Sequence, residues 1–234
     1  MYKKIEDELF FFVFGISSEA ERDKKIRVCI NKAYRDMCRT IRYKYTIDEI
    51  SKANLDPEKN KWKGDKEAFL VNIKNLINTN VEMLNDKYDV NIFDEWHENL
   101  INQMMGNGKN GKDIFNTDFT LGVGHSQKWV NMTLKYMYIM GILPKNIKEV
   151  MHIPIDSYIL NAAKAGKGDK IYDSFDVKGL GIVSDIKTWS KIDDYKKYLG
   201  FQKSVRTECG NMMPIEWERL AWMAEATRRS VEEK

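Results

Sequence analysis

The sequence is poor in cysteine and proline, and it has no long apolar run. Its 234 residues include 3 cysteines and 4 prolines. The cysteines Cys29, Cys38 and Cys209 are scattered without C-x-x-C spacing, which argues against a zinc or iron–sulfur motif and predicts reduced, packed thiols. The apolar run at residues 9–14 falls far short of the roughly 20 residues that cross a bilayer. We therefore interpret this run as a core segment and expect a soluble, cytoplasmic protein with no membrane partner.

The chain also lacks a large excess of basic over acidic residues, or the reverse. The chain has 38 Lys and Arg against 35 Asp and Glu, so its formal charge of +3 neither supports nor excludes binding to DNA. A hydrophobic content of 43% is ample for a buried core. We expect a single helical domain over residues 1–234, with an internal seam at 106–113 if the chain divides at all.

The spacing of apolar residues predicts an all-α protein of eight to ten helices. From Ser17 or Ser18, apolar side chains recur at three- and four-residue steps up to Ile41. Only Tyr45–Ile50 and Val177–Ile186 carry weak strand signals. A loop is expected at Asn54–Gly64, which contains Pro57, and another around Gly166–Asp169. Further helices are predicted at 65–77, 93–105, 126–140, from 156, at 193–209 and at 214–229.

A glycine-rich segment, Gly106–Asp113, nearly matches a phosphate-binding P-loop. The position that needs a Ser or Thr hydroxyl for Mg²⁺ holds Asp113, and the segment follows a predicted helix where the motif follows a strand. We therefore interpret it as a charged loop that ends the preceding helix.

The segment from Gly122 to Lys128 combines a Gly-Val-Gly turn with a predicted helix start. The first N–H groups of a helix have no intrahelical partner and point toward anions such as phosphate. If Ser126 is the N-cap, Lys128 lies in the first turn, where the positive end of the macrodipole favours the neutral amine that a nucleophile requires. Taken alone, however, the segment is better explained as a turn followed by a surface lysine.

A second helix start follows at Asp156. Pro154 favours an extended approach, and Asp156 falls where the next helix begins, so it is a natural N-cap. An isolated aspartate here needs no other role. A cap nevertheless fixes its carboxylate at a helix start, where it can stabilise a cationic intermediate or hold a water molecule.

The order of these elements resembles the helix-hairpin-helix DNA glycosylase superfamily, in which hairpin glycines, a lysine and a Pro/Val-Asp element follow one another. Lys128 lies four residues after Gly124 and 28 residues before Asp156. This long spacing looks most like that of the divergent, helix-rich 8-oxoguanine glycosylases. The cluster-bearing subfamily is excluded, because the chain lacks its four-cysteine motif.

The resemblance implies a DNA glycosylase that excises a damaged or modified base from duplex DNA, with AP-lyase activity if the lysine is the nucleophile. Lys128 would attack the sugar C1′ and form a Schiff base, and Asp156 would support the departing base. Gly122, Gly124 and Ser126 would bind a DNA phosphate. No cofactor or metal is implied. Because flipped bases are held by aromatic, amide and guanidinium groups, candidate base-recognition residues are Gln127, His152, Trp189, Gln202 and Arg206.

Two other functions compete with this one. A helical module that binds nucleic acid or protein without catalysis is consistent with the same sequence, because a fold does not establish chemistry. A metal-dependent nuclease would use His125, His152 and Asp156, which lack a recognised ligand spacing. Trp217 and Trp222 are expected in the core, since tryptophan is usually largely buried.

Overall fold

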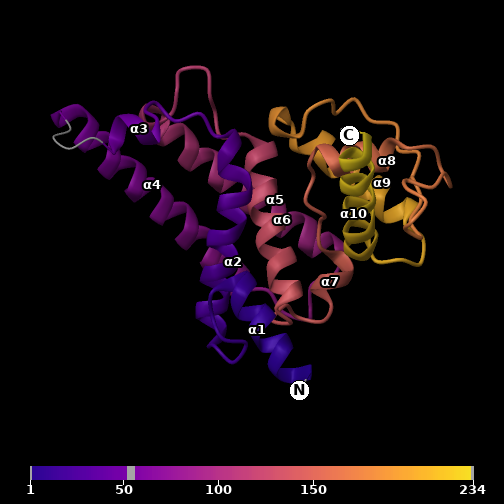
Figure 1. Cartoon of the computed structure of the whole chain (residues 1–234). Coiled ribbons are helices and arrows are strands. Elements are labelled where there is room, and N and C mark those ends of the chain that lie inside the picture. The colour runs from indigo at the N-terminus through magenta and orange to yellow at the C-terminus, as the bar shows by residue number, and fades with distance from the viewer. Residues whose placement is uncertain (1, 52–55, 233–234) are drawn as a thin grey trace.

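The computed structural model describes residues 2–51 and 56–232, and this part of the chain is helical (Figure 1). The predicted all-α class is confirmed: ten α-helices are present among these residues. The only β-type pairings in the described ranges are two isolated bridges, Tyr43 with Phe115 and Lys170 with Lys178. The helices are α1 (Tyr2–Phe14), α2 (Arg22–Met37), α3 (Ile47–Ile50), α4 (Pro57–Glu82), α5 (Val90–Asn110), α6 (Val123–Ile139), α7 (Ile147–Val150), α8 (Ser157–Lys164), α9 (Tyr195–Glu208) and α10 (Pro214–Glu232).

Helix α6 forms the centre of the molecule. It packs along α2 and against α5, and Figure 1 shows α4 on one side of it and α8, α9 and α10 on the other. The Trp129 side chain of α6 is fully buried and donates a hydrogen bond from Nε1 to the Ile30 carbonyl of α2. The predicted apolar face of α2 is buried, although the helix starts at Arg22 and not at Ser17 or Ser18. The buried apolar residues form one cluster that runs from Ile16 to Ala224.

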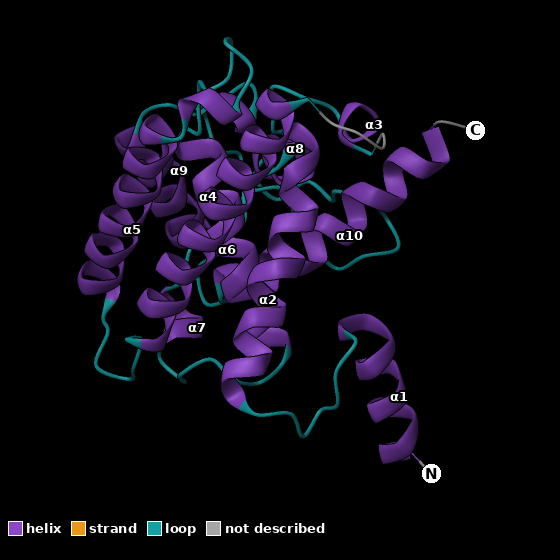
Figure 2. Ribbon diagram, turned by 90° about the vertical axis from the view of Figure 1, so that its left-hand side faces the viewer, coloured by secondary structure: helices purple, strands orange, loops and turns teal. Residues whose placement is uncertain are grey.

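The prediction that the apolar run at residues 9–14 is a core segment is wrong. These residues end α1, whose ribbon stands apart from the other helices in Figure 2. Phe12 is 87% exposed and Phe11 is 60% exposed, whereas Phe14 packs edge-on against Tyr136 of α6. Residues 9–14 are consecutive apolar residues, so their side chains point to all sides of this end of α1 and cannot all be buried against a single neighbour. Nowhere in residues 2–51 and 56–232 is a helix both long and apolar enough to cross a membrane.

Two predicted loops are helical in the structure. Helix α5 continues through Gly106 to Asn110. Within it, Gly108 lets the helix approach Leu121, since a Cβ atom there would lie 2.8 Å from the Leu121 Cβ. Pro57 begins α4 as its first residue, with Asp56 as the N-cap, which is a position that proline favours. The rest of that predicted loop, residues 54 and 55, lies outside the described residues. The weak strand signal at Tyr45–Ile50 belongs instead to α3, whose Thr46 and Glu49 form a capping box.

Candidate functional site

The Lys128 ammonium and the Asp156 carboxylate meet in the structure. Lys128 Nζ lies 2.8 Å from Asp156 Oδ2, although the residues are 28 positions apart in the chain. Their side chains are only 8% and 15% exposed, respectively. An ion pair so shielded from water interacts more strongly than a surface pair, and loss of one partner leaves an uncompensated charge. The two predicted catalytic residues therefore form one unit.

Asp156 is held from three directions. It is the N-cap of α8, as predicted, and its Oδ1 atom accepts a hydrogen bond from the Ile159 backbone N–H at 3.0 Å. Its Oδ2 atom accepts from Lys128 and, at 3.2 Å, from Nε1 of Trp222. One carboxylate oxygen thus stabilises the helix start while the other faces the lysine. The geometry leaves the carboxylate little rotational freedom.

A cleft of about 690 Å³ opens beside this pair. Trp189 and Trp222 both line it, and Lys128 Nζ lies 5.9 Å from the centre of the Trp189 ring. Trp222 is 39% exposed, so the prediction that it belongs to the core is wrong, whereas Trp217 is buried as predicted. The volume falls in the range of small-ligand sites, and the aromatic faces can contact a planar group. The remaining residues that line the cleft are Asp36, Arg39, Thr40, Met132, Lys135, Tyr136, Ser157, Tyr158 and Glu218.

A second ion pair lies in the same cleft. Lys135 Nζ lies 2.8 Å and 2.7 Å from the two carboxylate oxygens of Glu218, which is buried. Burial raises the pKa of Glu218, and the nearby Lys135 ammonium opposes that shift. Lys135 follows Lys128 by two helical turns, so both lysines project from the same face of α6. The sequence analysis missed this pair, although the seven-residue spacing of the lysines was a usable signal.

The predicted phosphate site at the start of α6 is not formed as expected. Gly122 is the N-cap, so Ser126 lies one turn inside the helix and Lys128 lies beyond the first turn. The Gly124 N–H donates to the Ile192 carbonyl at 2.9 Å, which leaves it no hydrogen for a phosphate. A Cβ atom on Gly124 would lie 2.0 Å from the Trp189 carbonyl oxygen. This glycine therefore lets the 3-10 helix η3 (Trp189–Lys191) pack against α6.

Four of the five residues predicted to recognise a base do not line the cleft. Gln127, His152 and Gln202 are buried, and the Arg206 guanidinium binds the Asp94 carboxylate through two hydrogen bonds of 2.7 and 3.1 Å. These amide, imidazole and guanidinium groups are occupied by partners in the protein interior, so the structure does not support a role for them in contacting a base. Trp189 alone of the five lines the cleft.

These buried polar groups form a network around two histidines. His152 Nε2 pairs with Asp94 at 2.9 Å, and its Nδ1 lies 2.9 Å from the Tyr198 hydroxyl. His97 lies 2.8 Å from the Tyr195 hydroxyl. Burial raises the pKa of Asp94, but hydrogen bonds from His152 and Arg206 outweigh it and hold that pKa below its usual range. Burial lowers the pKa of His152 to about 4, so its imidazole is neutral at pH 7.

The three residues considered as metal ligands do not converge. His152 is engaged by Asp94 and Tyr198, and Asp156 by Lys128. His125 is buried between the rings of Phe119 and Trp189, and the Thr40 backbone is the only polar group of the described residues that acts on its imidazole. Within the described residues, no three His, Cys, Asp or Glu side chains are grouped as a metal site would require.

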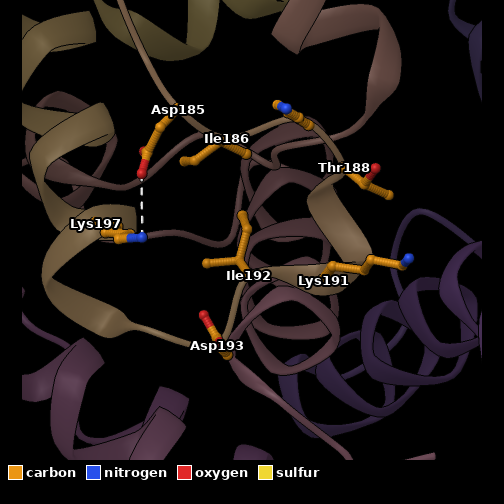
Figure 3. A pocket seen from close by; sticks show the side chains of 8 residues that line it. Asp185, Ile186, Thr188, Lys191, Ile192, Asp193 and Lys197 are labelled. Carbon is orange, nitrogen blue, oxygen red and sulfur yellow. Dashed lines mark ion pairs between the residues drawn. The ribbon is translucent and has the colours of Figure 1, made fainter.

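A smaller hollow of about 210 Å³ adjoins η3, and Figure 3 shows its side chains. An ion pair of 3.1 Å joins Asp185 to Lys197 across it. Both side chains are more than half exposed, and such pairs contribute little to stability. None of the predicted site residues lines this hollow. The cleft beside Lys128 is therefore the stronger candidate.

Comparison with protein-family models, curated proteins and solved structures finds no significant match to the chain.

Proposed function

We propose that the protein is a DNA glycosylase with lyase activity, in which Lys128 is the nucleophile and Asp156 the catalytic carboxylate. The contact of 2.8 Å between these two side chains at the edge of a large cleft is the observation that supports the proposal best. A shielded amine and a carboxylate, fixed beside an open space, are the two groups that base excision through a Schiff base requires.

The chemistry assigns a separate task to each group. After Lys128 gives up a proton to solvent, its amine attacks the sugar C1′ and the bond to the base breaks, so that the base departs with the bonding electrons and takes up a proton from solvent. Transfer of a proton from the new C1′ ammonium to O4′ breaks the C1′–O4′ bond and gives an iminium ion between Lys128 and C1′. Asp156 stabilises the positive charge that develops on the sugar, and loss of a C2′ proton expels the 3′ phosphate. Hydrolysis of the imine frees the lysine.

The walls of the cleft suit a flipped base. Trp189 and Trp222 offer aromatic faces, and stacking on an aromatic residue contributes about 1–3 kcal/mol per base. The Lys135 and Glu218 pair supplies a donor and an acceptor on the wall of the same cleft. A base held there would lie beside the Lys128 and Asp156 pair, since all six residues border one space.

Borohydride trapping tests the proposal. The protein is incubated with an abasic duplex, and with duplexes that carry one oxidised, alkylated or deaminated base, while borohydride reduces any imine to a stable amine. We expect a covalent protein–DNA adduct on at least the abasic duplex, and peptide mapping should place it on Lys128.

Three variants make the test specific. Lys128→Met should abolish the adduct, whereas Lys135→Met, on the same face of α6, should retain it when the DNA is saturating. Asp156→Asn keeps a side chain that caps a helix equally well and should slow the reaction by about 10²–10³-fold, the usual cost of removing one group that stabilises transition-state charge. Absence of an adduct with every duplex would refute the proposed chemistry, and an adduct that survives Lys128→Met would refute the role of Lys128.

A further inference from the structure

The segment that delivers Asp156 to Lys128 belongs to no helix or strand. It runs from the end of α7 to the start of α8, and Ile153 and Ile155 within it are completely buried. Backbone N–H and C=O groups in such a position need partners, because burying them unpaired costs free energy. In this segment, two glutamine side chains supply most of them, and Asn131 Nδ2 of α6 adds a hydrogen bond of 3.0 Å to the Ile153 carbonyl.

Gln127 of α6 binds the backbone of Ile155 with both ends of its amide. Its Oε1 accepts from the Ile155 N–H at 3.2 Å, and its Nε2 donates to the Ile155 carbonyl at 3.1 Å. The same Nε2 donates to the Gly124 carbonyl at 3.0 Å. Gln127 directly precedes Lys128 in the chain, and Ile155 directly precedes Asp156. A double hydrogen bond therefore joins the immediate neighbours of the two proposed catalytic residues.

Gln202 of α9 makes the same double contact two residues earlier. Its Oε1 accepts from the Ile153 N–H at 3.1 Å, and its Nε2 donates to the Ile153 carbonyl at 2.8 Å. A primary amide is a neutral side chain with both a donor and an acceptor that match a peptide group. Pro154, between the two contacts, has no N–H that needs a partner. The two glutamines thus hold one segment in the same manner but from different helices.

We propose that Gln127 is a positioning residue that sets the distance between Lys128 and Asp156, whereas Gln202 only anchors the segment. The consequence for catalysis rests on the proposed function. Gln127 lies on the same helix as the nucleophile, so its contact with Ile155 fixes the carboxylate directly relative to the amine. Gln202 lies on α9, and its loss leaves the link between α6 and Ile155 in place.

The matched variants Gln127→Met and Gln202→Met separate these roles. Both residues are buried, and each substitution removes the partner of one peptide N–H. Gln127→Met also removes the donor to the Ile155 carbonyl, whereas the Ile153 carbonyl in Gln202→Met still accepts from Asn131 Nδ2 at 3.0 Å. Gln127→Met should therefore lose more stability, and urea unfolding of both variants measures that loss separately from the rate. At saturating abasic DNA, Gln127→Met should lower the single-turnover rate about a hundredfold, the effect of a displacement of about 1 Å at a reacting group, with little change in DNA affinity. Gln202→Met should retain most of the rate.

A second measurement does not depend on the enzyme activity. Urea unfolding gives the free energies of unfolding of Lys128→Met, Asp156→Asn, the double variant and the wild type. Together these four values give the coupling free energy between Lys128 and Asp156. We expect this coupling to disappear when the cycle is repeated with Gln127→Met and to persist with Gln202→Met. If Gln127→Met does not fold, Gln127→Glu, which keeps the oxygen that accepts from Ile155, should weaken the coupling without abolishing it.

The outcomes distinguish the two proposals. Equal coupling in the Gln127 and Gln202 backgrounds, or equal rates for the two variants, would overturn the positioning role. If the wild-type protein forms no adduct while the coupling depends on Gln127, the proposed function fails and the positioning role of Gln127 stands.

Discussion

Acid should destabilise the protein strongly between pH 7 and pH 5, because all three of its histidines are buried. Burial lowers the pKa of His125 to about 4 and that of His152 to about 4. Burial also lowers the pKa of His97. An unfolded histidine titrates near pH 6.5, so between about pH 6.5 and pH 4 the unfolded chain binds protons that the folded chain does not. Stability therefore falls as the pH drops through this window.

The size of this loss in stability follows from the difference between the histidine pKa values in the folded and unfolded states. With a folded pKa of about 4 and an unfolded pKa of about 6.5, one histidine lowers the free energy of unfolding by about 2 kcal/mol between pH 7 and pH 5. His125 and His152 together then cost about 4 kcal/mol, and His97 acts in the same direction. This is a large part of the roughly 5–15 kcal/mol that stabilises an ordinary domain. Glu218, whose pKa is raised by burial, acts in the opposite direction.

Replacement of a single histidine isolates its part of the effect. His125 is best suited because its ring packs between Phe119 and Trp189 and because, among the described residues, only the Thr40 backbone opposes the effect of burial on its pKa. In His125→Phe, the decrease in unfolding free energy between pH 7 and pH 5, measured by urea denaturation, should be about 2 kcal/mol smaller than in the wild type. The free energies of unfolding of the variant and the wild type at pH 7 need not be equal. Equal decreases in the two proteins would refute the reasoning.

Three further substitutions have definite expected outcomes. Gly124→Ala should destabilise the fold by about 1–3 kcal/mol in urea titration, because the new methyl group would lie 2.0 Å from the Trp189 carbonyl oxygen and would push η3 away. The control Gly106→Ala, on an exposed part of α5 with no atom near the new methyl group, should stabilise the protein by about 0.4–1 kcal/mol; a loss of stability there would contradict the helical assignment. Trp222→Phe keeps an aromatic wall but removes the hydrogen bond to Asp156, so the trapping rate on abasic DNA should fall while affinity changes little. An unchanged rate would show that this hydrogen bond does not matter for the chemistry.

The sequence was enough to predict structural features that depend only on neighbouring residues in the chain. The N-cap role of Asp156 could be predicted because a short polar side chain after an X-Pro step has few alternatives to starting a helix. The apolar spacing of α2 likewise predicts the face that is buried against α6. The approach of Lys128 to Asp156 was expected only by resemblance, because nothing local brings two residues 28 positions apart into contact.

The predictions from sequence were wrong where contacts between distant parts of the chain determine the local structure or the burial of a side chain. The two tryptophans of α10 are five residues apart, so they project in directions that differ by roughly 140° on a helix of 3.6 residues per turn. One of them must leave the core if the other is buried, and Trp222 faces the cleft. Gly108 resembles a loop residue in the sequence, yet its function is to let α5 approach Leu121, which no local pattern shows.

The glutamine contacts to Ile153 and Ile155 also bear on how the chain can vary. Both are made to backbone atoms, which every residue except proline presents in the same form. Insertions or deletions beside the exposed Gly141 or Lys145, in the turn that follows α6, can therefore change the number of residues between Lys128 and Asp156 without moving the carboxylate. A fixed sequence spacing is then a poor criterion for finding relatives of this chain. If Gln127 sets the position of Asp156 as proposed, relatives should share a glutamine directly before the lysine and an apolar residue directly before the aspartate.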